Sequence, residues 1–261
     1  MLQRVSLFCV LMSAVPVVSS GQTGFANLFD HLHLAAPDQA KAVEWYRTHF
    51  GATPTPEGPD RAMLGPTRLI FQRSDAPKPS QGSVLGLIGF SVSDLDGTVK
   101  RLQSAGVKLV MPAMTMQGIR MAQVVDPWGT LIEVVQDAGQ LGLHHVGLVA
   151  ADPSALLGWF AETFGGKVAK FRGVQDGIDF GGVWLFAAKG SGAPSLGHAI
   201  DHIGFRPANV DNAVAAMKAK NVKVTTEPRP LVLPSGTAMR LAFVEGPGGV
   251  RIELVQRENL P

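Results

Sequence analysis

Three segments in the second half of the chain, LHHVGL (143–148), IDHIGF (200–205) and VRIELV (250–255), decide how the fold is interpreted. In each segment apolar residues alternate with polar or small ones, a pattern that predicts a β-strand with one buried face. Each segment also carries a side chain that can bind a metal, namely His145, His202 and Glu253. These side chains can meet only if the sheet curls around a common centre. Two imidazoles and one carboxylate then form a triad that leaves coordination positions open for substrate or oxygen.

The composition predicts a packed globular protein. Of the 261 residues, 46% are hydrophobic and 17% are charged, and the formal net charge is +2. Disordered chains are less hydrophobic and more highly charged. Proteins that bind nucleic acid usually have a concentrated basic surface, and this sequence has no block of like charges. We therefore expect no nucleic acid as partner; the sequence leaves a homodimer open.

Residues 1–20 have the pattern of a signal peptide. Arg4 supplies a positive charge, residues 5–18 are mainly apolar, and small residues occupy the −3 and −1 positions of a cleavage site after Ser20. The apolar run is short for a permanent anchor, so we expect no stable membrane insertion after cleavage; an uncleaved N-terminal anchor is the alternative. The only cysteine, Cys9, lies in this segment, so the mature chain would have no disulfide. We expect a periplasmic or secreted bacterial protein.

The rest of the chain repeats itself. Equivalent features return at an offset of roughly 115 residues. The clearest pairs are Trp45 with Trp159, Asp96 with Asp211, and Glu133 with Glu253. A near-constant offset indicates a duplicated domain, and we place the two copies at residues 27–137 and 141–257.

Each copy is predicted to contain two units of similar layout, in which a strand and a helix are followed by further strands. The first helix of the first copy follows Asp38, a suitable N-cap. Its counterpart has Asp152 as the cap and Pro153 at the first helical position. Four such units predict an α+β fold, in which helices cover one face of a sheet and the other face is concave.

Several motifs resemble those of the vicinal-oxygen-chelate (VOC) superfamily, which includes glyoxalase I, extradiol dioxygenases and the bleomycin- and fosfomycin-resistance proteins. They are DHLHL (30–34), DPWGTLIE (126–133), HHVGL (144–148) and DHIGF (201–205). The resemblance implies four βαβββ units paired into two tandem cup-shaped domains. It also implies a divalent metal, held by the first strand of each unit and the last strand of the second. Carried over to the C-terminal copy, the ligands are His145, His202 and Glu253.

The N-terminal copy departs from this pattern. Leu87 stands where His202 stands in the second copy, and leucine cannot bind a metal. His31 and Glu133 do occupy ligand positions, and His33 lies on the same strand face as His31. We predict that the metal site of the N-terminal copy is degenerate.

A different pairing of units is an alternative. In some family members a cup is built from units of different copies, in which case His31 would join His202 and Glu253. His145 would then lie opposite Glu133. Because the turn between the copies is short, the sequence analysis favours His145 as the first ligand.

The resemblance implies a metal-dependent enzyme with lyase, isomerase or dioxygenase chemistry, and the signal-peptide pattern implies that it is exported. Its substrate would be a small molecule that chelates the metal through adjacent oxygens, and the ion would be Fe²⁺, Zn²⁺, Ni²⁺, Mn²⁺ or Co²⁺. Arg240 recurs as Arg120 in the first copy and is predicted to bind a substrate oxygen as a catalytic residue. A surface ion pair with Glu245 is the alternative for Arg240.

For two reactions of the family, this chain lacks a residue that the family's enzymes use. Extradiol dioxygenases carry a tyrosine before the ligand glutamate, at a place that Phe243 occupies here. Glyoxalase I uses a second glutamate at the end of the cup's first unit, and residues 183–186 contain none. The alternative function is a binding protein of the bleomycin- or fosfomycin-resistance type that sequesters a small molecule. Such a protein would not need three well-placed metal ligands.

Overall fold

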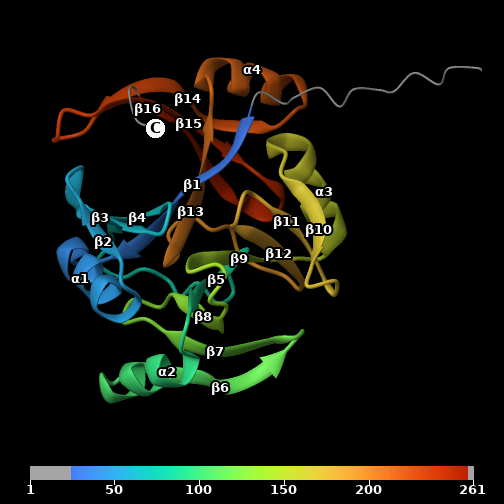
Figure 1. Ribbon diagram of the computed structural model, residues 1–261. Helices are drawn as coiled ribbons and strands as arrows, with labels where there is room; N and C mark the ends of the chain where they lie inside the picture. The colour runs from blue at the N-terminus through green and yellow to red at the C-terminus, as the bar shows by residue number, and fades with distance from the viewer. Residues whose placement is uncertain (1–24, 258–261) are drawn as a thin grey trace, which may run out of the picture.

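The computed structural model describes residues 25–257, so the predicted signal peptide at residues 1–20 lies outside the described part of the chain. In this part, sixteen strands form two eight-stranded sheets. The four α-helices of this part of the chain lie around the outside of the sheets (Figure 1). No helix among the described residues is long and apolar enough to cross a membrane. The expected α+β class is confirmed.

The four predicted βαβββ units are present. The first comprises β1 (Phe25–Ala36), α1 (Gln39–Phe50), β2 (Thr53–Thr55), β3 (Gly58–Leu64) and β4 (Thr67–Arg73). The second comprises β5 (Leu85–Val92), α2 (Leu95–Ser104), β6 (Lys108–Met116), β7 (Ile119–Val125) and β8 (Leu131–Gln136). The third comprises β9 (Gly142–Ala150), α3 (Pro153–Phe164), β10 (Lys167–Phe171), β11 (Gln175–Asp179) and β12 (Trp184–Lys189). The fourth comprises β13 (Ile200–Pro207), α4 (Val210–Ala219), β14 (Lys223–Val232), β15 (Ala238–Glu245), the short 3₁₀ turn η1 (Pro247–Gly249) and β16 (Arg251–Arg257).

Each sheet combines units from both copies. The order β14-β15-β16-β13-β1-β4-β3-β2 joins the first and fourth units, and β10-β11-β12-β9-β5-β8-β7-β6 joins the second and third. In the centre of each sheet, the first strands of the two units pair antiparallel, β1 with β13 and β5 with β9. We call the sheet of units one and four cup A, and that of units two and three cup B. The expectation that residues 141–257 alone form a cup is therefore wrong.

The connections explain this pairing. Only residues 137–141 separate β8 from β9, and a short connection favours strands that stay in one sheet. The links after β4 and β12 are longer, and they run side by side, bridged at Lys78–His198 and Ser83–Ala193. Each long link carries the chain from one sheet to the other. The short turn between the copies thus keeps units two and three in one sheet. It does not favour the pairing of units three and four that the choice of His145 as first ligand assumed.

Local sequence sets the helix boundaries as predicted. Asp38 and Asp152 accept hydrogen bonds of 3.0 Å from the backbone N–H three residues on, and Asp94 and Asn209 do the same at the other two helices. Gly51 ends α1 with φ of 72°, a left-handed conformation that glycine adopts at little cost.

One hydrophobic core joins the two sheets. Tyr46 on α1 of cup A packs edge-on against Phe90 on β5 of cup B, with ring centroids 5.8 Å apart. Phe164 on α3 of cup B stacks on Phe205 of β13 in cup A at 4.4 Å. These aromatic contacts pack the two cups against each other.

The Tyr46 hydroxyl donates a 2.8 Å hydrogen bond to the buried Asp126 carboxylate, which links the first unit to the second. We predict that Tyr46→Phe lowers the free energy of unfolding by about 1–3 kcal/mol, because a buried carboxylate loses a donor. Urea denaturation measures the change. Tyr46→Phe combined with Asp126→Asn should cost less than the sum of the two single changes; additive costs would show that the bond contributes nothing.

Candidate metal centre

Four side chains that can bind a metal converge in cup A. They are His31 and His33 on β1, His202 on β13 and Glu253 on β16, and one ligand atom from each lies within 4.8 Å of the others. The Nε2 atoms of His31 and His202 are 3.1 Å and 3.0 Å from the same oxygen, Oε2 of Glu253. The Nε2 of His33 is 4.0 Å from that oxygen. Three imidazole nitrogens and a carboxylate oxygen therefore surround one point.

Strand register produces this convergence. On the antiparallel pair β1 and β13, His33 lies opposite His202 and His31 lies opposite Gly204. On the parallel pair β13 and β16, Gly204 lies beside Glu253. Gly204 therefore stands between His31 and Glu253, and a Cβ on it would lie 2.0 Å from the His31 ring. Glycine leaves the space through which the imidazole reaches the carboxylate.

Two aspartates orient the imidazoles. The Nδ1 atoms of His31 and His202 lie 2.7 Å from the carboxylate oxygens of Asp30 and Asp201, the residues just before them. A carboxylate that accepts a proton from Nδ1 leaves the lone pair of Nε2 directed to the centre, an arrangement common behind metal-bound histidines. Arg257 in turn donates to Asp30, and Arg251 donates to Asp201. The imidazoles of His31 and His202 are thus each held by a carboxylate, and an arginine holds each carboxylate in turn.

The charges of the cluster depend on burial and on these contacts. Burial raises the pKa of Glu253, but His31 and His202 outweigh it and hold that pKa well below its usual value. Burial lowers the pKa of His31. Glu253 and Asp30 raise this pKa by a larger amount, so it lies above its usual value. Burial and the neighbouring imidazoles His202 and His31 depress the pKa of His33 well below its usual value. Glu253 is therefore ionised and His33 neutral, the states in which both can bind a metal.

The residues of cup A fit a divalent cation. Nitrogen and carboxylate oxygen donors in this combination suit Fe²⁺, Zn²⁺, Ni²⁺, Mn²⁺ or Co²⁺. His33 stacks on His202 with ring centroids 4.1 Å apart, and its buried Nδ1 has no hydrogen-bond partner among the described residues. Its side chain is 19% exposed and is the most accessible of the four. His33 therefore stands at the side of the cluster that a substrate can reach.

A cavity of about 270 Å³ opens beside the cluster. Its walls carry apolar side chains, among them Ile70, Leu241 and Phe243, together with four arginines: Arg61, Arg229, Arg251 and Arg257. The guanidinium of Arg251 lies 4.0 Å from the centre of the Phe243 ring, which packs on His202. The cavity can therefore hold a small molecule with a negatively charged or oxygen-rich end.

The structure brings together two of the three predicted ligands. His202 and Glu253 share the centre of cup A, but His145 lies on β9 in cup B. The Nε2 of His145 is 3.0 Å from Oε2 of Glu133, the pairing of the alternative assignment. The choice of His145 as first ligand is therefore corrected to His31, because units one and four, not three and four, share a sheet.

The structure does not support the catalytic role predicted for Arg240. Its side chain is 37% exposed, donates to Asp211 on α4, and does not line the cavity of cup A. Arg120 pairs in the same way with Asp96 on α2. The recurrence of this arginine therefore reflects a repeated strand-to-helix ion pair, and the partner of Arg240 is not Glu245.

The residues that hold the cluster in place were not predicted from the sequence. Asp30 and Asp201 each precede a ligand histidine in an Asp-His pair, so the repeated dipeptide was a usable signal. Arg251 and Arg257 flank Glu253 on β16, at positions whose partners only the paired strands reveal.

Cup B keeps only half of the ligand set. Leu87 on β5 lies opposite Gly147 on β9, where cup A has His202 opposite His33. His145 and Glu133 remain in contact, and Gly89 leaves room for the His145 ring as Gly204 does for His31. Among residues 25–257, the cluster of cup A is the group identified as able to hold a metal.

Comparison with known proteins agrees with this architecture. The model of the Glyoxalase/Bleomycin resistance protein/Dioxygenase superfamily matches residues 28–134 and 142–254. No curated protein matches the chain. Glyoxalase I from Zea mays has a similar structure, with a TM-score of 0.66, 20% identity, and coverage of 87% of this chain and 91% of that one.

A putative dioxygenase from Bacillus subtilis is also similar, with a TM-score of 0.62, 15% identity, and coverage of 87% of this chain and 84% of that one. At these identities the likeness concerns the fold. The family model, in contrast, matches most of the sequence, once in each copy. The chain therefore belongs to the Glyoxalase/Bleomycin resistance protein/Dioxygenase superfamily.

Proposed function

We propose that this protein is a metal-dependent enzyme whose active site is cup A. The observation that carries the proposal is the convergence of His31, His33, His202 and Glu253 within 4.8 Å, with carboxylates behind two of the imidazoles. A surface group of this composition would be solvated, but His31, His202 and Glu253 are buried. Buried titratable groups that perturb one another are typical of functional sites.

The substrate is a small molecule with two adjacent oxygens. His31, His202 and Glu253 would hold the ion on one side, which leaves the cavity side open to a chelating ligand. When bound, the ion supplies Lewis-acid stabilisation of negative charge on a substrate oxygen. The arginines of the cavity orient an anionic end, and Ile70, Leu241 and Phe243 exclude water from its apolar part.

Two features restrict the reaction. Phe243 offers no hydroxyl beside the cluster, although it packs against His202. In the fourth unit, Glu253 lies beside Gly204. At the equivalent place in the first unit, Ile70 on β4 lies beside His33. The first unit of cup A therefore supplies no second glutamate there. Lyase, isomerase and dioxygenase reactions share stabilisation of an enolate-like oxygen. We therefore propose the substrate class rather than a single reaction.

We also propose export to the bacterial periplasm or the medium. This rests on the charge and apolar pattern of residues 1–20. Mass spectrometry of the protein recovered from the periplasm of an expressing bacterium should give a chain that begins at Gly21. Recovery of the full-length chain from the cytosol would contradict export.

We predict that the purified protein holds about one divalent ion per chain, as three or four protein ligands allow. His31→Ala should lose the ion, because it removes a ligand from cup A. His145→Ala is the matched control at the equivalent place in cup B and should keep it. Elemental analysis after gel filtration measures the content. Loss of metal in His145→Ala with retention in His31→Ala would reverse the assignment.

Gly204→Ala and Gly89→Ala form a second matched pair. Each places a Cβ 2.0 Å from an imidazole, that of His31 in cup A and of His145 in cup B. Both should lower the free energy of unfolding by about 1–3 kcal/mol through overpacking. Only Gly204→Ala should lose the metal, because only it moves a ligand. Equal metal content in the two variants would show that His31 does not bind the ion.

Turnover tests the enzymatic proposal directly. Metal-loaded protein is assayed against catechols, 2-oxoaldehyde adducts and 2-oxoacids, each of which presents adjacent oxygens. Activity that disappears in His31→Ala and Glu253→Gln but survives in His145→Ala supports cup A as the active site. Tight binding of one of these compounds by the metal-free protein, with no turnover when metal is restored, would instead favour the sequestering function.

A further inference from the structure

Cup B contains a cavity that the proposed metal chemistry does not use. Its volume is about 290 Å³, against about 270 Å³ in cup A. Cup B has leucine and glycine in place of two imidazoles, and the surroundings of a smaller side chain fill the space it leaves only in part. Cup B therefore lacks two of the four ligand-type residues of cup A but has a cavity of similar volume, close to the smallest size usual for ligand pockets, about 300 Å³.

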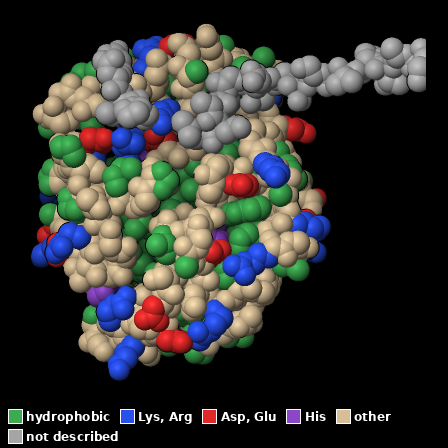
Figure 2. Space-filling model, viewed as in Figure 1, with side chains coloured by type: hydrophobic (Ala, Val, Ile, Leu, Met, Phe, Trp, Pro, Cys, Tyr) green, Lys and Arg blue, Asp and Glu red, His purple; other side chains and the backbone are tan. Residues whose placement is uncertain are grey.

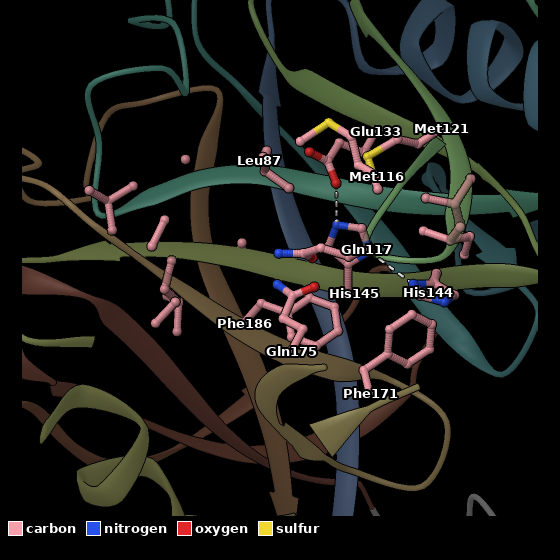
Figure 3. A pocket seen from close by; sticks show the side chains of 18 residues that line it. Leu87, Met116, Gln117, Met121, Glu133, His144, His145, Phe171, Gln175 and Phe186 are labelled. Carbon is pink, nitrogen blue, oxygen red and sulfur yellow. Dashed lines mark hydrogen bonds and ion pairs between the residues drawn. The ribbon is translucent and has the colours of Figure 1, made fainter. Parts of the chain in front are cut away.

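The walls of this cavity suit an aromatic molecule. Phe171 and Phe186 lie along one side, and Met116 and Met121 lie on the opposite side, near Leu87 (Figure 3). The two phenyl rings have centroids 5.7 Å apart, and Trp184 stacks on Phe186 behind them. Rings and thioether sulfurs both interact favourably with a flat aromatic guest.

A polar pair, Glu133 and His145, lies among these mainly apolar walls, which also include Gln117, Gln175 and His144. Glu133 and His145 point toward each other, and Oε2 of Glu133 is 3.0 Å from Nε2 of His145 (Figure 3). Oε1 of Glu133 accepts a 2.8 Å hydrogen bond from Gln123. A carboxylate oxygen has more than one lone pair, so each can accept a further bond. The Glu133 side chain is 15% exposed, which makes these lone pairs accessible from the cavity.

His144 adds a further polar group to the wall, and its Nε2 lies 3.9 Å from Oδ2 of Asp137. His144 lines the cavity and is buried, and its Nδ1 is 2.9 Å from Nδ1 of His145. Its Nε2 has no hydrogen-bond partner among the described residues. Burial and the charge of His145 lower the pKa of His144 to about 4, so this ring is neutral near pH 7. Glu133, by contrast, keeps a pKa below its usual value, because His145 and Gln123 outweigh the effect of burial.

Hydrogen bonds hold part of the rim of cup B in place. Met116 and Gln117 stand at the β6–β7 hairpin, and Gln175 begins β11 on the other side. Arg172, in the turn before β11, donates a 3.0 Å hydrogen bond to the carbonyl of Gly118 and a 3.2 Å bond to Asp137. The bond to Gly118 joins the β10–β11 turn to the β6–β7 hairpin at the edge of the cavity, and the bond to Asp137 joins the same turn to the link between β8 and β9. Figure 2 shows hydrophobic side chains toward the middle of the face it presents, with charged side chains both around and among them.

We propose that cup B is a metal-independent binding site for a small aromatic molecule that carries one hydroxyl or amino group. The ring lies between Phe171, Phe186 and the methionines, and its donor hydrogen bonds to the Glu133 carboxylate. The site is separate from cup A, so it does not depend on the metal or on the reaction proposed there.

Binding of 2-naphthol to chelator-treated, metal-free protein tests this site. Isothermal titration should show one molecule bound per chain, with a dissociation constant on the order of 10–100 μM, as expected for a ligand of this size. Naphthalene, which lacks the hydroxyl, should bind more weakly. Glu133→Gln should weaken 2-naphthol roughly tenfold or more, because a charge-assisted hydrogen bond is lost, and should leave naphthalene unchanged.

Matched variants in the two cups separate this proposal from the metal proposal. Met121→Trp should fill cup B and abolish 2-naphthol binding, while Leu241→Trp, at the equivalent position of cup A, should not; circular dichroism melting verifies that each folds. Glu253→Gln should lose metal and keep 2-naphthol affinity, and Glu133→Gln should do the reverse. Absence of saturable binding to the wild type overturns the proposal. Binding that is insensitive to Glu133→Gln, or lost in Leu241→Trp instead, also overturns it.

Discussion

The organisation of this protein depends on the buried carboxylate of Glu253. An ionised carboxylate away from water costs several kcal/mol unless charged or hydrogen-bonding partners compensate. Here His31 and His202 approach the same oxygen from two strands that lie far apart in the sequence. The compensation requires β1 and β16 to flank β13, so the first and last units of the chain must share a sheet.

The partners of the histidines extend this requirement outward. Asp30 and Asp201 hold the two imidazoles, and Arg257 and Arg251 hold the aspartates, so hydrogen-bonded side chains extend from the centre to the wall of the cup. Removal of one member would leave its neighbour buried without a partner, which is more costly than the loss of an exposed ion pair. Such a network keeps the ligand atoms close together and oriented before any cation arrives, which favours metal affinity.

The two cups show how few residues separate two kinds of site. Both have a histidine and a glutamate in contact, and both have a glycine that makes room for the imidazole ring. Leucine and glycine in cup B replace two histidines of cup A, at one opposed pair of positions. That difference sets a centre with four potential metal ligands in cup A against a mainly apolar cavity in cup B. The same scaffold thus presents two cavities with different chemistry.

Much of the structure followed from the sequence alone, because the relevant signals are local. The capping residues Asp38 and Asp152 mark helix starts, alternation marks strands, and the repeat identifies four similar units. Alternation also shows which face a side chain occupies, so His202 and Glu253 could be assigned to one concave surface.

Only the tertiary structure decided that His31, and not His145, joins His202 and Glu253. Both histidines lie in first strands with similar local patterns, and the choice depends on which strands pair across the long links and the shared aromatic core. The Arg251 and Arg257 contacts and the cavity of cup B likewise depend on packing between units, which no local pattern records.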